Sequence, residues 1–126
     1  MNSDSTTTVA ELRQLVQRFV DERDWRQFHA PKNLSMSLAI EAAELMEHFQ
    51  WIDSAASREL SGDPQKLVAI ADELADVMCY AFALANELGI DISAAVRAKM
   101  LKNALKYPAG EFRGRFGHDD PRAPAQ

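Results

Sequence analysis

Apolar residues recur at three- and four-residue intervals along most of the chain, the spacing that places side chains on one face of an α-helix. A first helix is predicted from Thr8, which opens a T-x-x-E capping box, to about Asp24. Three further helices are predicted over about residues 34–50, 63–88 and 91–107. No strand pattern and no internal repeat accompanies them.

Residues with strong preferences for helix ends support these boundaries. Asp63 and Pro64 are suited to the N-cap and the first turn of a helix, and Gly89 is suited to the left-handed position that ends one. Pro31 is unfavourable inside a helix, so residues 25–33 are predicted to be irregular.

The chain is therefore predicted to be all-α, with four helices around one core. The helix over 63–88 is apolar around most of its circumference, which predicts an oligomer because such a helix must be covered on most sides. Three segments are expected: a disordered N-terminus over 1–7, one helical domain over 8–108 and a flexible tail over 109–126.

Composition narrows the class of protein. The 126 residues carry a formal net charge of −5, which disfavours a broad nucleic-acid-binding surface. The longest apolar run, residues 77–85, is much shorter than the roughly 20 residues of a membrane span, and no secretory leader is recognised. The expectation is a cytoplasmic protein without a membrane partner, with its single cysteine, Cys79, as a small core residue.

Two motifs concentrate carboxylates within alanine-rich helical segments. Glu41 and Glu44 form E-A-A-E, and Glu73 and Asp76 form E-L-A-D. Positions i and i+3 share a helix face, so each pair can direct its oxygens toward one point. Four converging carboxylates need a cation, and an oxygen-only ligand set suits Mg²⁺, with Mn²⁺ as a possible substitute. Solvated surface charge is the alternative for each pair taken alone.

A di-iron site of the ferritin type is disfavoured. Such bundles use Glu-x-x-His on two helices, whereas the helix over 63–88 has no histidine. His48 is four residues beyond Glu44 and is interpreted as a surface or partner contact.

Other residues could bind a nucleotide. Lys99, Asn103 and Lys106 share one helix face and could hold outer phosphates, although a solvated face is the usual role of lysines. Trp25 and Trp51, at the two ends of the predicted second helix, are suited to stacking on a base or to simple packing.

The two acidic motifs together resemble the E-x-x-E…E-x-x-D pattern of the MazG-like all-α nucleotide pyrophosphohydrolases. Three flanking segments, R-D-W-R-Q-F-H-A-P-K-N-L, H-F-Q-W and K-M-L-K-N-A-L-K-Y-P, resemble its dCTP pyrophosphatase branch. The resemblance covers about residues 9–108.

This resemblance implies Mg²⁺-dependent hydrolysis of a nucleoside triphosphate to the monophosphate and pyrophosphate, with dCTP or a modified dCTP as substrate. It implies that the four carboxylates are the catalytic metal ligands and that the chain forms homodimers that assemble into homotetramers. The positions that match substrate-contacting residues are Trp25, His29, Asn33, Trp51, Tyr80, Lys99, Asn103 and Tyr107, and Lys106 is added as a substrate-binding candidate from its helix spacing.

Two alternatives stay open at this point. Val16 stands where the resemblance implies a histidine near the base, so dUTP or another non-cytosine nucleotide is an alternative substrate. A non-catalytic helical oligomerisation module is the alternative to an enzyme. Glu47, one turn beyond Glu44, is either a further metal-associated group or a solvated charge.

Overall fold

A computed structural model of the protein describes residues 2–117 and 119–121, and every regular element within these ranges is a helix. The elements, in chain order, are α1 (Val9–Glu22), η1 (Arg26–Phe28), α2 (Pro31–Glu47), α3 (Ser54–Glu59), η2 (Leu60–Gly62), α4 (Pro64–Leu88), α5 (Ile92–Lys106) and α6 (Ala109–Phe112). The all-α prediction is confirmed. The predicted count of four is not, because the described residues form six α-helices, of which α3 and α6 are short.

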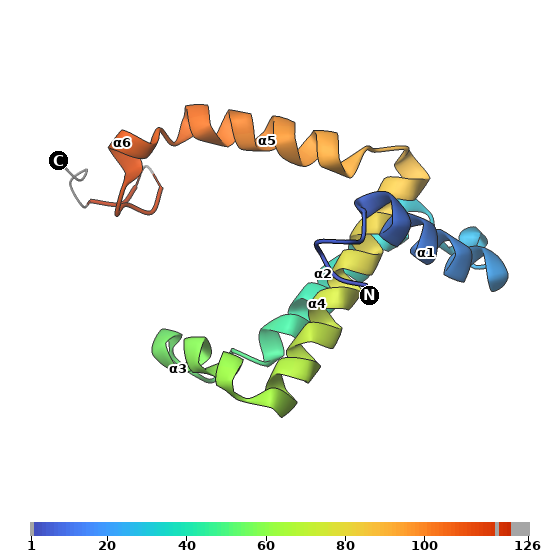
Figure 1. Ribbon diagram of the computed structural model, residues 1–126, viewed down its shortest axis with the longest axis horizontal. Helices are drawn as coiled ribbons and strands as arrows, with labels where there is room; N and C mark the ends of the chain where they lie inside the picture. Colours follow the sequence, from blue (N-terminus) through green and yellow to red (C-terminus); the bar gives the residue numbers. More distant parts are fainter. Residues whose placement is uncertain (1, 118, 122–126) are drawn as a thin grey trace. The chain divides into compact units, whose positions relative to one another are not determined.

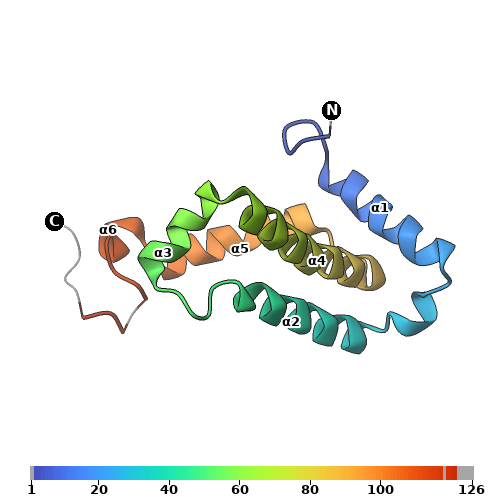
Figure 2. The same ribbon diagram turned by 90° about the horizontal axis from the view of Figure 1, so that it is seen from below.

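The chain divides into two compact units, residues 1–90 and 91–126, and each is described by itself. In the first unit, α2 and α4 lie side by side and run in opposite directions, and α1 packs against α4 (Figures 1 and 2). Leu34 of α2 is 2% exposed, and Val20 of α1 and Phe82 of α4 are also buried. These three helices therefore supply the core of the first unit.

Three predicted helix ends, at Thr8, Asp63 and Gly89, agree with the structure. Thr8 Oγ1 accepts the Glu11 N–H at 3.2 Å, and the Glu11 carboxylate accepts the Thr8 N–H, as in a capping box. Asp63 Oδ1 accepts the Lys66 N–H at 3.1 Å at the start of α4. Gly89 ends α4 with φ = 64°, a conformation that glycine adopts without strain.

The predicted start of the second helix was wrong. α2 begins at Pro31, not near residue 34, because a proline at the first helical position gives up an N–H that has no partner within the helix. The segment predicted to be irregular before it contains the short helix η1. The C-terminal end of α2 is Glu47, three residues before the predicted end at Gln50.

The second unit begins with Asp91, whose side chain accepts the Ala94 N–H at 2.8 Å and caps α5. Phe112 of α6 is buried and packs edge-to-face on Tyr107, with ring centroids 5.2 Å apart. α6 therefore orders part of the segment that the sequence predicts to be a flexible tail, and residues 118 and 122–126 of that segment lie outside the described residues.

At the other end of the chain, the Thr6 and Thr7 N–H groups donate to the Ser3 carbonyl at 3.0 and 2.9 Å and form a turn within the segment predicted to be disordered. Residue 1 of that segment lies outside the described residues. The segment boundaries at residues 8 and 108 stay predictions.

The first unit leaves much apolar surface uncovered on α4. Val68 is 63% exposed and Leu74 is 50% exposed, and Leu67 and Met78 are also exposed. Among the residues that the structure describes, none of the helices combines the length and the apolar character that crossing a membrane requires.

Candidate active site

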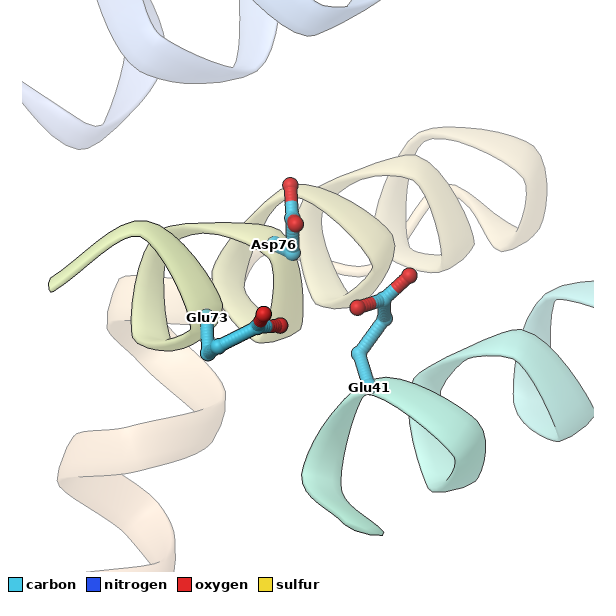
Figure 3. A group of neighbouring side chains, drawn as sticks. All are labelled: Glu41, Glu73 and Asp76. Carbon is cyan, nitrogen blue, oxygen red and sulfur yellow. The ribbon is translucent and has the colours of Figure 1, made fainter. Parts of the chain in front are cut away.

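Three carboxylates from two helices meet between α2 and α4. Glu41 extends from α2 toward α4, where the Glu73 carboxylate points back toward it and Asp76 lies one turn further along (Figure 3). One oxygen from each residue lies within 4.8 Å of the other two. Glu73 and Asp76 share a face because they are i and i+3 on α4, and the antiparallel pairing of the helices brings Glu41 opposite them.

Two of these oxygens are buried without a hydrogen-bond partner among the described residues. They are Oε2 of Glu41 and Oε2 of Glu73. A buried carboxylate oxygen is costly when no donor or cation compensates its charge. The cluster is thus a set of carboxylate oxygens whose charge a cation would compensate.

The pKa values of the cluster reflect the same feature. Desolvation contributes most to raising the pKa of Glu41 from 4.5 to about 7. A side-chain hydrogen bond with Glu44, the charge of Glu44 and then the charges of Asp76 and Glu73 raise it further. Desolvation and the neighbouring Glu44 and Asp76 charges also raise the pKa of Glu73. Each shift indicates that the folded chain disfavours the ionised form at this point.

Glu44 and His48 lie at the edge of the cluster. Glu44 is exposed, and its carboxylate is close enough to act on both Glu41 and Glu73, although it is not one of the three whose oxygens meet. The positive charge of His48 lowers the pKa of Glu73 against the larger opposing effects. His48 therefore lies near the cluster, and its spacing of one and two turns from Glu44 and Glu41 on α2 is the signal that could have indicated this.

The donor set fits a hard divalent cation. Carboxylate oxygens on two facing helices, two of them buried and unpartnered, are the ligands that Mg²⁺ and Mn²⁺ take in proteins. Neither nitrogen nor sulfur belongs to the group of three, which disfavours zinc.

An apolar pocket of about 390 Å³ adjoins the cluster in the first unit. Asp76 belongs both to the cluster and to the pocket wall. The remaining wall residues come from α1, α4 and the segment between α1 and α2: Leu15, Val16, Phe19, Val20, Trp25, His29, Cys79, Tyr80 and Ala83. An apolar cavity that opens beside a cluster of anionic oxygens can bind a flat, uncharged ring next to a group held by a cation.

Three of the residues expected to contact substrate, Trp25, His29 and Tyr80, line this pocket. Trp25 packs edge-to-face on Phe19, with ring centroids 5.6 Å apart. Cys79, predicted to be a core residue, is exposed and lines the pocket. The other α1 residues of the wall, Leu15, Phe19 and Val20, were predicted only as apolar helix positions, whereas the family resemblance had already placed Val16 near the base.

Two further expected residues lie outside the pocket lining. Trp51 is 87% exposed beyond the end of α2. Asn33 is exposed in the first turn of α2, where its Nδ2 donates to the Phe28 carbonyl at 3.3 Å. Their contact with substrate stays a prediction.

The remaining expected residues are in the second unit. Lys99 and Asn103 lie on α5, where Asn103 is half-buried. The Lys106 ammonium lies 5.2 Å from the centre of the Tyr107 ring, a cation–π contact at the end of the helix. Their roles toward a phosphate also stay predictions.

Comparison with known proteins gives a consistent result. A model of the MazG-like family matches residues 36–115, which include all four motif carboxylates. The dCTP pyrophosphatase 1 of Rattus norvegicus is 40% identical over 107 residues, which are 85% of this chain and 63% of that protein. The Homo sapiens protein of the same name is 40% identical over 102 residues, 81% of this chain and 60% of that protein. The chain thus spans less than two thirds of the length of these relatives.

Among solved structures, the crystal structure of a pyrophosphatase from Archaeoglobus fulgidus has a TM-score of 0.72 and is 35% identical in sequence. The match covers 86% of this chain and 99% of that one. The likeness therefore extends over nearly the whole of that protein.

Proposed function

Because the chain belongs to the MazG-like family, we propose that it is a nucleoside triphosphate pyrophosphohydrolase that hydrolyses the bond between the α- and β-phosphates. The products are a nucleoside monophosphate and pyrophosphate. One observation carries the proposal: Asp76 joins a cluster of three carboxylates to the wall of an apolar pocket. A nucleotide needs both, since its phosphates require a cation and its base requires an apolar, stackable surface.

In this proposal, Glu41, Glu73 and Asp76 hold Mg²⁺ or Mn²⁺, and Glu44 completes the set from the edge of the cluster. The bound cation would neutralise phosphate charge and lower the pKa of a nearby water. The two buried, unpartnered oxygens support this assignment, because a cation satisfies both of them.

The chain's own carboxylates also serve the proton transfer. A water oxygen forms a bond to the α-phosphorus while the bond from that phosphorus to the bridging oxygen breaks, and pyrophosphate leaves with the bonding pair. The water proton passes to Glu41 or Glu44. A carboxylate within hydrogen-bond reach of the attacking water can accept this proton.

For the substrate, we propose dCTP or a modified dCTP, in agreement with the name of the Rattus norvegicus and Homo sapiens relatives. The base would enter the apolar pocket beside Trp25, with His29 and Tyr80 as polar groups of the wall in addition to Asp76. Apart from Asp76, which belongs to the cluster, the wall carries no Asp, Glu, Arg or Lys, so shape and stacking contribute more to base binding there than charge does.

We further propose that the active form is a homodimer that assembles into a homotetramer. The exposed side chains of Leu67, Val68, Leu74 and Met78 on α4 support it, since the first unit by itself leaves them in water. Light scattering at micromolar concentration should give a mass of two or four chains, and a 14.1 kDa species alone would contradict it.

The reaction is tested by product analysis in ¹⁸O-labelled water with a panel of nucleoside triphosphates and Mg²⁺. We expect pyrophosphate release, the label in the monophosphate, and the highest kcat/KM for dCTP or a 5-substituted dCTP. Orthophosphate with a diphosphate product would refute the cleavage position. Higher kcat/KM for dUTP would reassign the substrate alone.

A non-catalytic module would hydrolyse nothing in this panel. The matched variants are Glu73→Gln, which should abolish turnover, and Asp72→Asn, which should not, since Asp72 is an exposed residue of α4 outside the cluster. Equal activity of both variants would refute the metal-ligand assignment.

A further inference from the structure

Arg13 of α1 and Asn86 of α4 hold each other through two hydrogen bonds. The Arg13 Nε–H donates to Asn86 Oδ1 at 3.0 Å, and Asn86 Nδ2 donates to the Arg13 backbone carbonyl at 3.1 Å. Both residues are half-buried and are 73 positions apart in the chain. Their reciprocal geometry ties the backbone of α1 to a side chain of α4.

This pair continues the two helix faces that form the pocket. On α1, Arg13 shares a face with Val16 and Val20, three and seven positions later. On α4, Asn86 shares a face with Ala83 and Cys79, three and seven positions earlier. Four residues of these faces line the pocket: Val16, Val20, Cys79 and Ala83. The two polar residues, Arg13 and Asn86, contact each other outside the pocket lining.

The buried residues of these two helices are apolar and lack such directionality. They are Val20 of α1 and Phe82 and Ala83 of α4, and apolar contact alone tolerates sliding and rotation of one helix on another. A pair of hydrogen bonds, one from the guanidinium to the amide and one from the amide to the backbone carbonyl, does not, because each bond is lost when the donor–acceptor geometry changes. The pair therefore fixes the position of α1 along α4.

A second contact at the next residue of α4 acts on the adjoining segment. The Glu87 carboxylate lies 3.5 Å from Arg26 Nε in η1, between the pocket residues Trp25 and His29. The Glu87 side chain is 18% exposed and that of Arg26 is 72% exposed, so this ion pair is weaker than the half-buried pair of Arg13 and Asn86. Asn86 and Glu87, which are consecutive on α4, thus contact α1 and η1 respectively. The pocket residues that do not belong to α4 lie on α1 or next to η1.

We infer that Arg13 and Asn86 are positioning residues for base binding: they set the width of the apolar pocket by holding α1 against α4, and they do not touch the phosphates. This inference rests on the proposed function for its kinetic consequence. Its structural consequence, a looser wall around Trp25, does not depend on any activity.

The kinetic test uses Asn86→Leu, which removes both hydrogen bonds at nearly constant volume, and Arg13→Met, which keeps the aliphatic stem. We expect KM for dCTP to rise about tenfold in Asn86→Leu and less in Arg13→Met, which keeps the hydrogen bond from Asn86 to the backbone carbonyl of residue 13. In both variants kcat should stay within about twofold of wild type, as expected for lost ground-state binding. Inhibition by pyrophosphate, a probe without a base, should change less than about twofold, because the carboxylate cluster is undisturbed.

Three further variants separate positioning from general destabilisation. The double variant should be no worse than Asn86→Leu alone, since Asn86→Leu already removes both hydrogen bonds. Asn86→Asp should recover part of the lost affinity, because its carboxylate accepts a charge-assisted hydrogen bond from Arg13 but cannot donate to the Arg13 carbonyl. Arg18→Met, at an exposed arginine of the same helix, should leave KM unchanged.

A fluorescence measurement keeps the inference testable if no nucleotide is turned over. In a Trp51→Phe background, Trp25 is the remaining tryptophan, and Asn86→Leu should increase its quenching by acrylamide while the helix content stays the same. Unchanged KM together with unchanged quenching overturns the inference. A parallel rise of KM and of the pyrophosphate inhibition constant also overturns it, because that result means the whole site has been disturbed. Wild-type protein without activity refutes the proposed function and leaves the quenching result to decide this one.

Discussion

Replacing Glu73 with glutamine tests the carboxylate cluster without any substrate. Glutamine keeps the shape of the side chain but is not an anionic ligand, and the change removes a buried, unpaired carboxylate oxygen beside Glu41 and Asp76. We therefore expect two opposite effects on the melting temperature. In EDTA the variant should melt above wild type because repulsion is relieved, and in Mg²⁺ it should lose the stabilisation that wild type gains.

The size of the Mg²⁺ effect follows from linkage. At a Mg²⁺ concentration one hundred times Kd, binding to the folded state alone contributes about 2.7 kcal/mol. Unfolding entropy of about 2.1 cal/mol/K per residue gives about 0.26 kcal/mol/K for this chain of 126 residues, so wild type should gain about 10 °C.

Differential scanning fluorimetry with a Mg²⁺ titration measures both effects at fixed protein concentration, since any oligomer would otherwise shift the melting temperature. The matched control is Asp72→Asn, one position earlier on α4 and exposed, which should keep the full Mg²⁺ shift. An undiminished Mg²⁺ shift in Glu73→Gln would refute the assignment of this residue as a ligand. A lower melting temperature of the variant in EDTA would refute the argument that its buried charge is unfavourable.

Three further outcomes are expected. In EDTA, the metal-free protein should lose stability as pH rises from about 4.5 to about 7, because the raised pKa of Glu41 makes the folded state bind a proton more tightly than the unfolded state does in that range. The urea midpoints of unfolding at about pH 5 and about pH 8 should therefore differ less in Glu41→Gln than in wild type. Trp25→Ala should raise KM for dCTP about tenfold with little change in kcat, since base stacking contributes roughly 1–3 kcal/mol; an unchanged KM would place the base elsewhere. Leu34→Ala should lower the free energy of unfolding by about 3 kcal/mol, because this side chain is 2% exposed, and a loss below about 1 kcal/mol would contradict its place in the core.

The helix ends were predictable from sequence because their causes are local. Thr8, Asp63 and Gly89 act on backbone groups within one turn, so the capping box, the N-cap and the left-handed end could be recognised from the residues alone. Pro31 was misread for an equally local reason, since the same residue breaks the interior of a helix and is favourable at its first position.

The site was predictable only within each helix. The i, i+3 spacing correctly placed Glu73 and Asp76 on one face of α4, but the rotation of α2 about its own axis decides whether Glu41 or Glu44 extends furthest toward them. That rotation depends on packing across the whole helix pair. The pocket was less predictable still. The family resemblance placed Val16 near the base, but Leu15 and Phe19 become wall residues only through the placement of α1 on α4.

The cluster joins parts of the chain that are far apart in sequence. Glu41 lies on α2, whereas Glu73 lies on α4 beyond α3 and η2 (Figure 3). A cation held by both residues would act as a cross-link that closes the segment between Glu41 and Glu73 into a loop. Such a link stabilises the fold by lowering the conformational entropy of the unfolded chain. Separation of α2 from α4 would then require release of the ion, so amide hydrogen exchange along α2 should slow as Mg²⁺ concentration rises. The Mg²⁺ concentration would thereby control how often α2 and α4 separate, in addition to the catalytic activity of the site.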